Sequence, residues 1–253
     1  MRQSRSLEFK IATRVAFSEV QATLSAIQHH NHTDLDIAPI AMGILPFDAS
    51  SAGDFFIPKQ VVGKDDKGNC WLTTIDDASV NLEISQPPLA TTNTFTVRPL
   101  TPIENYLQAV ARARDAVREG RITKAVIARE ILVEAQQPID VHAVLQRLRS
   151  TFGNSYRYSM NGFIGASPEL LIEVSGQTIR SHPLAGTTPR TGDPITDNEL
   201  ARKLISSMKD QVEHRVVIDV IHDMLLPYCS YLDWEPEPSV IQVANVQHLG
   251  TLI

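Results

Sequence analysis

Three short segments of this sequence place charged side chains inside or beside apolar runs, where they could do chemistry. Lys124 opens the run KAVIAR, and Glu169 follows the turn-like segment GASP. Asp210 and Glu213 begin an otherwise apolar helical stretch. One amine and three carboxylates placed in this way indicate an acid/base pair beside a metal site.

Lys124 lies near the start of a predicted strand over residues 122–133. The period-two geometry of a strand puts its side chain on one face with Val126, Ala128 and Leu132. A partly buried lysine would lose its charge readily and could act as a base. The alternative is a lysine at a strand end whose ammonium group lies in solvent.

Glu169 begins a predicted strand whose opposite face is apolar. Desolvation there would raise the pKa of the carboxyl group and keep it protonated as a general acid. The alternative is a surface carboxylate, as Glu173 on the same face could be. The pattern alone does not separate the two interpretations.

Asp210 and Glu213 are three residues apart on a predicted helix, so they share a face. Two like charges there oppose each other unless a cation intervenes, and Mg²⁺ takes one or two protein carboxylates together with substrate oxygens and water. The alternative is that both residues simply interact with the positive end of the helix dipole. The neighbouring His214 is interpreted as a structural histidine.

A loop rich in glycine and proline spans residues 183–190. It could offer backbone N–H groups to an anion, with Gly186 allowing close approach. His248, in the segment VQHL, indicates little by itself.

Composition limits the class of protein. The chain has 253 residues, 43% of them hydrophobic, which is enough for a substantial core. The net charge is −6 and no lysine/arginine cluster is dense, so we expect no nucleic-acid partner. Cys70 and Cys229 fit neither a disulfide framework nor a metal-ligand spacing. The N-terminal segment is polar and no apolar run approaches the ~20 residues of a membrane span, so we expect a soluble, cytoplasmic protein with no membrane partner.

The order of elements favours an α+β fold with antiparallel sheets. Residues 1–95 are expected to be rich in strands, with a hairpin turn at 64–69, and residues 96–253 to form the second part of the chain. Thr101, Pro102 and Glu104 predict a capped helix start, and Gly120 its end. The further predicted elements are a helix that begins at 138–140 and ends at Gly153, a β-meander over 154–184 with a hairpin turn at 175–176, and helices over 197–206 and 208–226.

Resemblance to the chorismate-utilising enzyme family rests on five motifs that occur in order. They are KAVIAR at 124–129, GASPELL at 165–171, PLAGT at 183–187, KD at 209–210 followed by EH at 213–214, and QHL at 247–249. The family includes anthranilate, aminodeoxychorismate, isochorismate and salicylate synthases. The segments GILPFD, SHPLAG, LPYC and PSV look most like siderophore-pathway isochorismate synthases.

The resemblance implies a hydroxyl-adding enzyme. The amine-using members typically carry glutamine where this chain has Lys124, and aminodeoxychorismate synthases tend to place a lysine where it has Ala185. The implied reaction is the isomerisation of chorismate to isochorismate, which would supply a siderophore or salicylate route. Lys124 would deprotonate the water that attacks C2, and Glu169 would protonate the departing C4 hydroxyl.

The remaining implied roles concern binding. Glu213, with Asp210 close behind, would hold Mg²⁺ against the ring carboxylate of chorismate. Gly186 and Thr187 would contact the substrate, and His248 would lie near its ring carboxylate. The implied fold is the family's α+β arrangement of two large antiparallel sheets with outer helices, and the expected oligomeric state is a monomer.

Members of the family continue past the position of Ile253 with a second magnesium-binding glutamate and a carboxylate-binding arginine. We therefore expect a chorismate-binding fold that is incomplete at its C-terminus. Two alternatives stay open at this point: a salicylate synthase, which makes isochorismate and then eliminates pyruvate, and a non-catalytic remnant that acts as a binding module.

Overall fold

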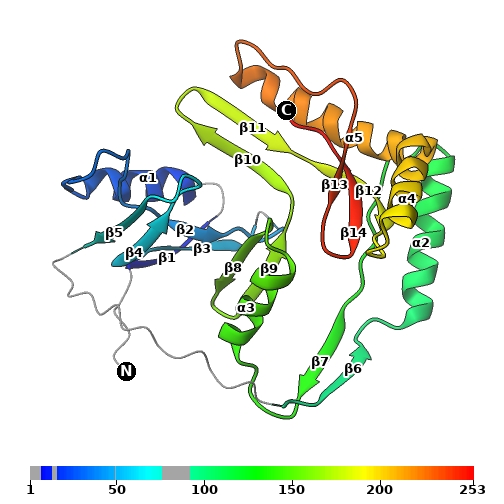
Figure 1. Ribbon diagram of the computed structural model, residues 1–253, viewed down its shortest axis with the longest axis horizontal. Coiled ribbons are helices and arrows are strands. Elements are labelled where there is room, and N and C mark those ends of the chain that lie inside the picture. The colour runs from blue at the N-terminus through cyan, green and yellow to red at the C-terminus, as the bar shows by residue number, and fades with distance from the viewer. Residues whose placement is uncertain (1–6, 13–15, 49, 76–91) are drawn as a thin grey trace. The chain divides into compact units, whose positions relative to one another are not determined.

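The computed structural model describes residues 7–12, 16–48, 50–75 and 92–253 (Figure 1). The chain divides into two compact units, residues 1–87 and 88–253. Pro87, Pro88 and the polar residues 91–93 predict a connector between the units, of which residues 87–91 lie outside the described residues. No helix in the described part of the chain has the length and apolar character needed to cross a bilayer.

The first unit contains a three-stranded antiparallel sheet in the order β1-β3-β2, a hairpin and one helix. Its elements are β1 (Leu7–Ala12), α1 (Ala16–Ala26), β2 (Met42–Ile44), β3 (Ala52–Ile57), β4 (Gln60–Lys64) and β5 (Cys70–Thr74). The predicted turn at 64–69 is confirmed: it joins β4 to β5, and the Asp65 N–H donates to the Asn69 carbonyl at 3.0 Å.

Helix α1 was not expected in a segment that was interpreted as strands and turns. Its apolar side chains Phe17, Val20 and Leu24 recur at spacings of three and four, which is a helical period. Val20 and Phe55 of β3 are buried together, and Leu24 and Ala41 pack against them. Burial of this stripe against β3 stabilises the helix.

The second unit holds four helices, a short 3₁₀ segment and nine strands among its described residues. They are β6 (Phe95–Pro99), α2 (Ile103–Arg118), β7 (Ile131–Ala135), α3 (Val141–Thr151), β8 (Tyr156–Met160), β9 (Phe163–Ser167), β10 (Leu170–Ser175), β11 (Thr178–His182), β12 (Leu184–Pro189), α4 (Pro194–Ser206), α5 (Met208–Leu225), η1 (Leu226–Tyr228), β13 (Ser239–Gln242) and β14 (Val246–Gly250).

The predicted end of α2 and the predicted start of α3 are confirmed, whereas the predicted start of α2 is wrong. Gly120 follows α2 with a φ of +71°, the left-handed conformation that glycine adopts without steric cost. Asp140 caps α3 by accepting from the backbone N–H groups of His142 and Ala143. The start of α2 differs from the predicted capping box: Pro102 occupies the N-cap position and no side chain caps the helix.

The predicted strand over 122–133 is too long at its N-terminal end. Regular pairing begins at Ile131, which lies opposite Pro99, the last residue of β6. The chain before Ile131 has no regular secondary structure between residues 124 and 130. Beyond Pro99, which lacks a backbone N–H, the pairing reduces to bonds from the Leu100 and Thr101 N–H groups to the Glu130 carbonyl, and α2 begins at Ile103. Lys124 therefore lies in an irregular segment rather than on a strand.

The meander is confirmed as two antiparallel hairpins, β8–β9 and β10–β11. All described strand pairings are antiparallel, and helices are interspersed among them, which confirms the α+β class. No described strand belongs to a sheet of more than three strands. The described residues therefore do not assemble the two large sheets that the family resemblance implies, because β6 and β7, β8 and β9, and β10 and β11 form separate two-stranded sheets.

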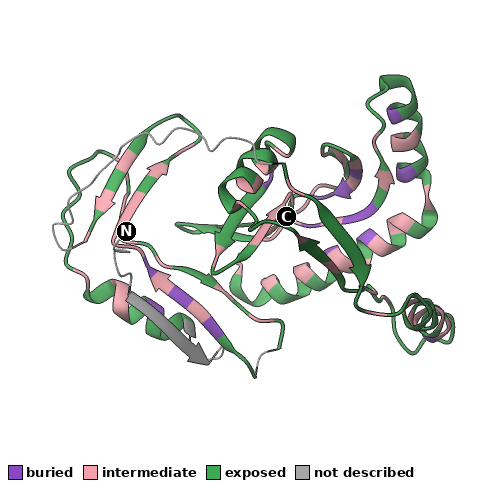
Figure 2. Cartoon of the chain, turned by 90° about the horizontal axis from the view of Figure 1, so that it is seen from below, coloured by how far each residue is buried: buried purple, intermediate pink, exposed green. Residues whose placement is uncertain are grey.

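The sheet β12-β14-β13 packs against α4 and α5 (Figure 1). The buried residues of this layer of sheet and helices lie in β12, β14, α4 and α5 (Figure 2). Leu249 has 0% exposure and Leu204 of α4 has 3%. Both helices were predicted, although α4 begins at Pro194 rather than 197, after an Asp193 cap. This packed layer positions the residues described next.

Candidate active site

An open pocket of about 270 Å³ lies in the second unit. Six of the seven residues predicted for a site line it: Lys124, Glu169, Gly186, Thr187, Glu213 and His248. They come from positions up to 124 residues apart in the sequence. The seventh, Asp210, lies one helical turn before Glu213 on α5. The fold therefore brings together side chains that local patterns could only suggest one by one.

Lys124 points at Glu213 from the irregular segment. Its Nζ lies 3.6 Å from Oε1 of Glu213, with the two side chains 23% and 31% exposed. Both groups are therefore largely withdrawn from water, while the pocket beside them stays open. Of the two interpretations that the sequence left open, this exposure fits the partly buried lysine rather than one whose ammonium group lies in solvent.

The ammonium group of Lys209 lies between the carboxylates of Asp210 and Glu213. Nζ of Lys209 is 3.4 Å from Oδ1 of Asp210 and 3.4 Å from Oε2 of Glu213. The negative charge of Asp210, with that of Glu213, raises the pKa of Lys209. The Lys209 side chain is 80% exposed, so its ammonium group approaches the two carboxylates from the solvent side. The arrangement shows that the two carboxylates can share one positive charge.

Glu169 lies in the turn between β9 and β10, directly before the strand. Its Oε1 accepts a hydrogen bond from the backbone N–H of Leu184 at 3.1 Å, which ties it to the start of β12. Its own N–H donates to Oγ of Ser167 at 3.2 Å. The residue is exposed, so the desolvation considered from the apolar pattern is absent. The carboxyl group is nevertheless oriented, because the Leu184 contact fixes one of its oxygens.

Thr187 and His248 face each other across β12 and β14. Oγ1 of Thr187 and Nδ1 of His248 are 3.0 Å apart, and the two residues are register partners. Burial lowers the pKa of His248, opposed by a hydrogen bond to the Gly186 backbone and by the charge of Glu169. The imidazole is thus mostly neutral near pH 7.

Gly186 sits in a bulge between Ala185 and Thr187. Its φ is +78°, a conformation that strains any residue with a Cβ. A Cβ here would also lie 3.1 Å from Cβ of Asp210. The glycine therefore lets β12 approach the first turn of α5, and it brings this pocket-lining strand next to Asp210 and Glu213.

His214 is a structural residue, as expected. It is 1% exposed and its Nε2 lies 2.8 Å from Oγ1 of Thr251. Burial lowers the pKa of His214, and the positive charge of Lys124 lowers it further. This histidine links α5 to the segment after β14 instead of facing the pocket.

The sequence analysis missed the polar groups behind the pocket, above all Asp197 and Gln247, which are 5% and 0% exposed. The Asp193-Pro194 pair is a recognisable helix start and could have placed α4 correctly. No local pattern marks Asp197 or Gln247 as buried, because their partners lie on other elements. Their contacts are described below.

The geometry supports acid/base chemistry in one place. An amine and an oriented carboxyl group open on the same pocket, and a carboxylate pair able to share a cation lies at its side. Across the described ranges, no three His, Cys, Asp or Glu side chains come together as metal ligands. Mg²⁺ does not require three, since substrate and water oxygens commonly complete its shell.

Comparison with known proteins places this arrangement in a family. The sequence model of the family of chorismate binding enzymes matches residues 7–253 of this chain. Isochorismate synthase DhbC of Bacillus subtilis is 27% identical over 85% of this chain and 54% of its own length. Isochorismate synthase EntC of Escherichia coli is 28% identical over 84% of this chain and 53% of its own length.

A solved structure shares the fold. The menaquinone-specific isochorismate synthase MenF of Escherichia coli superposes with a TM-score of 0.72 at 23% identity, over 97% of this chain and 59% of that one. The chain spans about half the length of the two curated relatives. Because the family model covers nearly the whole sequence, this chain belongs to the chorismate-binding enzyme family.

Proposed function

We propose that this protein converts chorismate into isochorismate. The observation that carries the proposal is the meeting of Lys124, Glu169 and Glu213 on one pocket. Curated relatives that bear the name isochorismate synthase support it. The product would be a precursor for a siderophore or salicylate route.

The reaction exchanges one hydroxyl group for another. The Lys124 amine takes a proton from a water molecule as the water oxygen bonds to C2 of the ring. Both ring double bonds shift, from C1=C2 to C1=C6 and from C5=C6 to C4=C5, and the C4–O bond breaks. Glu169 gives a proton to the departing hydroxyl, which leaves as water. Atoms and charge balance, because the proton taken by Lys124 replaces the one given by Glu169.

The two reacting groups are held for these roles. Lys124 must lose its proton before it can act as a base. Its Nζ lies 3.6 Å from Oε1 of Glu213, and this contact holds the side chain at the pocket. Glu169 is oriented by the Leu184 N–H, which leaves its second oxygen available for the substrate. General acids and bases that are positioned in this way typically accelerate a reaction by about 10²–10⁴-fold.

Substrate binding falls to the bulged strand and its partner. Gly186 and Thr187 line the pocket together with His248. A neutral His248 whose Nδ1 is engaged by Thr187 can present Nε2 to the substrate. We assign His248 to the ring carboxylate of chorismate, and the Gly186–Thr187 backbone to the same end of the ring.

The residues present fit a magnesium ion. Glu213 and Asp210 offer carboxylate oxygens, the ligand type that Mg²⁺ prefers, and the Lys209 ammonium already shows that a cation can lie between them. Glu213 would hold the ion, with Asp210 behind it. When bound, Mg²⁺ would anchor the ring carboxylate of chorismate and offset its charge.

Product chromatography tests the proposal directly. The chain is incubated with chorismate and MgCl₂, and the products are separated and quantified. Isochorismate as the only product is expected. Salicylate with pyruvate would assign the protein to the two-step synthases instead, and absence of any product would contradict catalysis by this chain.

Replacing Glu213 by glutamine is expected to raise the Mg²⁺ concentration required for half-maximal rate by at least about tenfold. The amide keeps the shape of the side chain but removes the negative charge that attracts the ion. The measurement is the initial rate as a function of MgCl₂ concentration. Glu199→Gln on the exposed side of α4 is the matched control, and an unchanged titration in Glu213→Gln would remove Glu213 from the metal site.

A further inference from the structure

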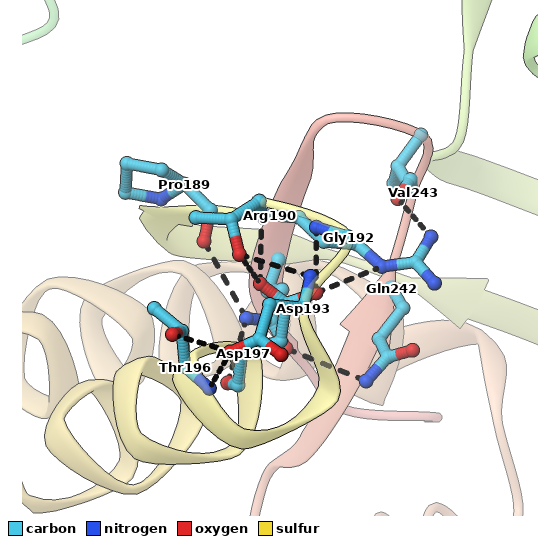
Figure 3. A network of polar contacts seen from close by, with 10 residues as sticks. Pro189, Arg190, Gly192, Asp193, Thr196, Asp197, Gln242 and Val243 are labelled. Carbon is cyan, nitrogen blue, oxygen red and sulfur yellow. Dashed lines mark hydrogen bonds and ion pairs between the residues drawn. The ribbon is translucent and has the colours of Figure 1, made fainter.

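We propose that Asp197 and Gln247 are positioning residues that fix β12 and β14 so that Thr187 and His248 stay aligned in the pocket. Neither residue touches the pocket itself. The inference rests on the proposed function where it concerns chorismate, and on geometry alone where it concerns the alignment of Thr187 with His248. Its basis is a buried polar network between the sheet and the first turn of α4 (Figure 3).

Gln247 is the central residue of the network on the sheet. It is 0% exposed, and its Nε2 donates to the Asp197 carbonyl at 3.0 Å and to the Pro189 carbonyl at 3.5 Å. Its Oε1 accepts from Nε2 of Gln242 at 3.4 Å. One amide therefore joins β14 to α4, to the end of β12 and to β13.

Asp197 holds the loop that leads from β12 into α4. Its Oδ1 accepts from the N–H and the hydroxyl of Thr191 at 2.7 and 2.8 Å, and its Oδ2 accepts from the Gly192 N–H at 3.1 Å. The Arg190 guanidinium lies 3.7 Å away. The Thr191 backbone hydrogen bond, above all, lowers the pKa of Asp197. The carboxylate is thus an acceptor that closes the loop directly after β12.

Arg190 extends the network to the turn between β13 and β14. Its Nη1 donates to the Val243 carbonyl at 3.0 Å, and its backbone N–H donates to the Asn245 carbonyl at 2.9 Å. Figure 3 shows its guanidinium between Val243 and the Asp197 carboxylate. The C-terminal end of β12 and the N-terminal end of β14 are therefore both fixed by directional hydrogen bonds.

The network is one residue away from the pocket side chains. Thr187 is opposite His248 and Thr188 is opposite Gln247. Because successive side chains of a strand point to opposite faces, His248 faces the pocket while Gln247 faces α4. A movement of Gln247 must move His248 with it, since the two share a peptide bond.

Directional bonds explain why polar residues occupy this place. Apolar side chains would bury the same layer, but they hold no fixed register, whereas a satisfied buried network specifies one arrangement. The bulge at Gly186 makes this strand pair prone to a shift, because part of its ladder is already interrupted. The network lies beyond the bulge and holds that half of β12.

The test compares Gln247→Met and Asp197→Asn with the control Asp193→Asn. The Asp193 side chain caps the same helix through Thr196, and among the described residues it forms no hydrogen bond with β14. Long-range ¹H–¹⁵N correlation spectra of labelled protein report the two ring nitrogens of His248. We expect both test variants to shift the His248 nitrogens and to lose the single tautomer, while the His142 signals and the control stay unchanged.

Kinetics supply the second readout. We expect KM for chorismate to rise about tenfold or more in Gln247→Met and Asp197→Asn, with kcat changed much less, because a small misplacement of binding groups is costly. Asp193→Asn is expected to keep the wild-type KM. A fall in kcat with an unchanged KM would overturn the positioning role toward substrate.

The spectra separate this inference from the proposed function. His248 signals that match the wild type in both variants would overturn the inference, whether or not chorismate is turned over. Shifted signals without any turnover by the wild type would uphold the alignment role and overturn the proposed function. Asp197→Asn serves as the second variant should Gln247→Met fail to fold.

Discussion

Replacing Lys124 by alanine is expected to lower the rate of isochorismate formation by a factor on the order of 10²–10⁴. Alanine removes the only amine that contacts Glu213 from the irregular segment 122–130, and with it the group that would deprotonate water. The fold should survive, because a partly exposed ion pair contributes roughly 1 kcal/mol or less. The measurement is kcat for chorismate, with circular dichroism as the check on folding.

Lys203→Ala on the exposed side of α4 removes a lysine that does not line the pocket, and it should keep the wild-type rate. Methylamine added to the Lys124→Ala variant offers a further check, since a small amine can restore part of the lost base catalysis. Wild-type turnover in Lys124→Ala would show that another group activates the water.

Glu169→Gln is expected to slow the reaction by a similar factor, about 10²–10⁴-fold, through loss of the proton donor. The glutamine Oε1 can still accept the hydrogen bond from the Leu184 N–H that Glu169 accepts at 3.1 Å. The orientation of the side chain is thus kept while its acidity is lost. The loss should appear in kcat, with KM for chorismate nearly unchanged.

The matched control for this change is Glu173→Gln. Glu173 lies on β10, four residues further along, and is also exposed, but it does not line the pocket. Its replacement should leave kcat at the wild-type value. Equal losses in Glu169→Gln and Glu173→Gln would indicate a general effect of charge and would withdraw the role of general acid from Glu169.

The features that could be predicted from the sequence are those fixed by local rules. Gly120 ends a helix because its left-handed conformation costs a glycine little, and Asp140 caps the next helix with its own side chain. The hairpin predicted at 175–176 joins β10 to β11, with its turn one residue later at 176–177, and Gly176 adopts a φ of +59° there. In each case the few residues concerned carry all the information.

The wrong predictions concern features that depend on residues far away in the sequence. The length of β7 depends on where its partner β6 ends, at Pro99. The residue pattern of 122–133 contains no information about the end of β6. Helix α1 forms against Phe55, some thirty residues later. Glu169 stays exposed despite its apolar neighbours, because exposure depends on which elements cover a strand.

The same distinction applies to the candidate site. Its residue types were visible from the sequence, but their meeting was inferred only from the order of motifs that resembles a family. The positioning pair, Asp197 and Gln247, could not be inferred from either source. Each has a polar side chain that a single sequence would assign to the surface, and only the packing of α4 on the sheet buries them.

The bulge at Gly186 divides β12 into two halves that are out of phase. Ala185 is opposite Leu249, yet Thr187 is opposite the very next residue, His248. Side-chain alternation therefore cannot be counted through this strand, and a sequence alignment judged by alternation would be off by one on one side of the glycine. Deleting Gly186 would remove the extra residue of β12 and leave Thr187 opposite His248 in an uninterrupted ladder. The extra residue therefore serves the approach of β12 to Asp210 rather than the pairing with β14.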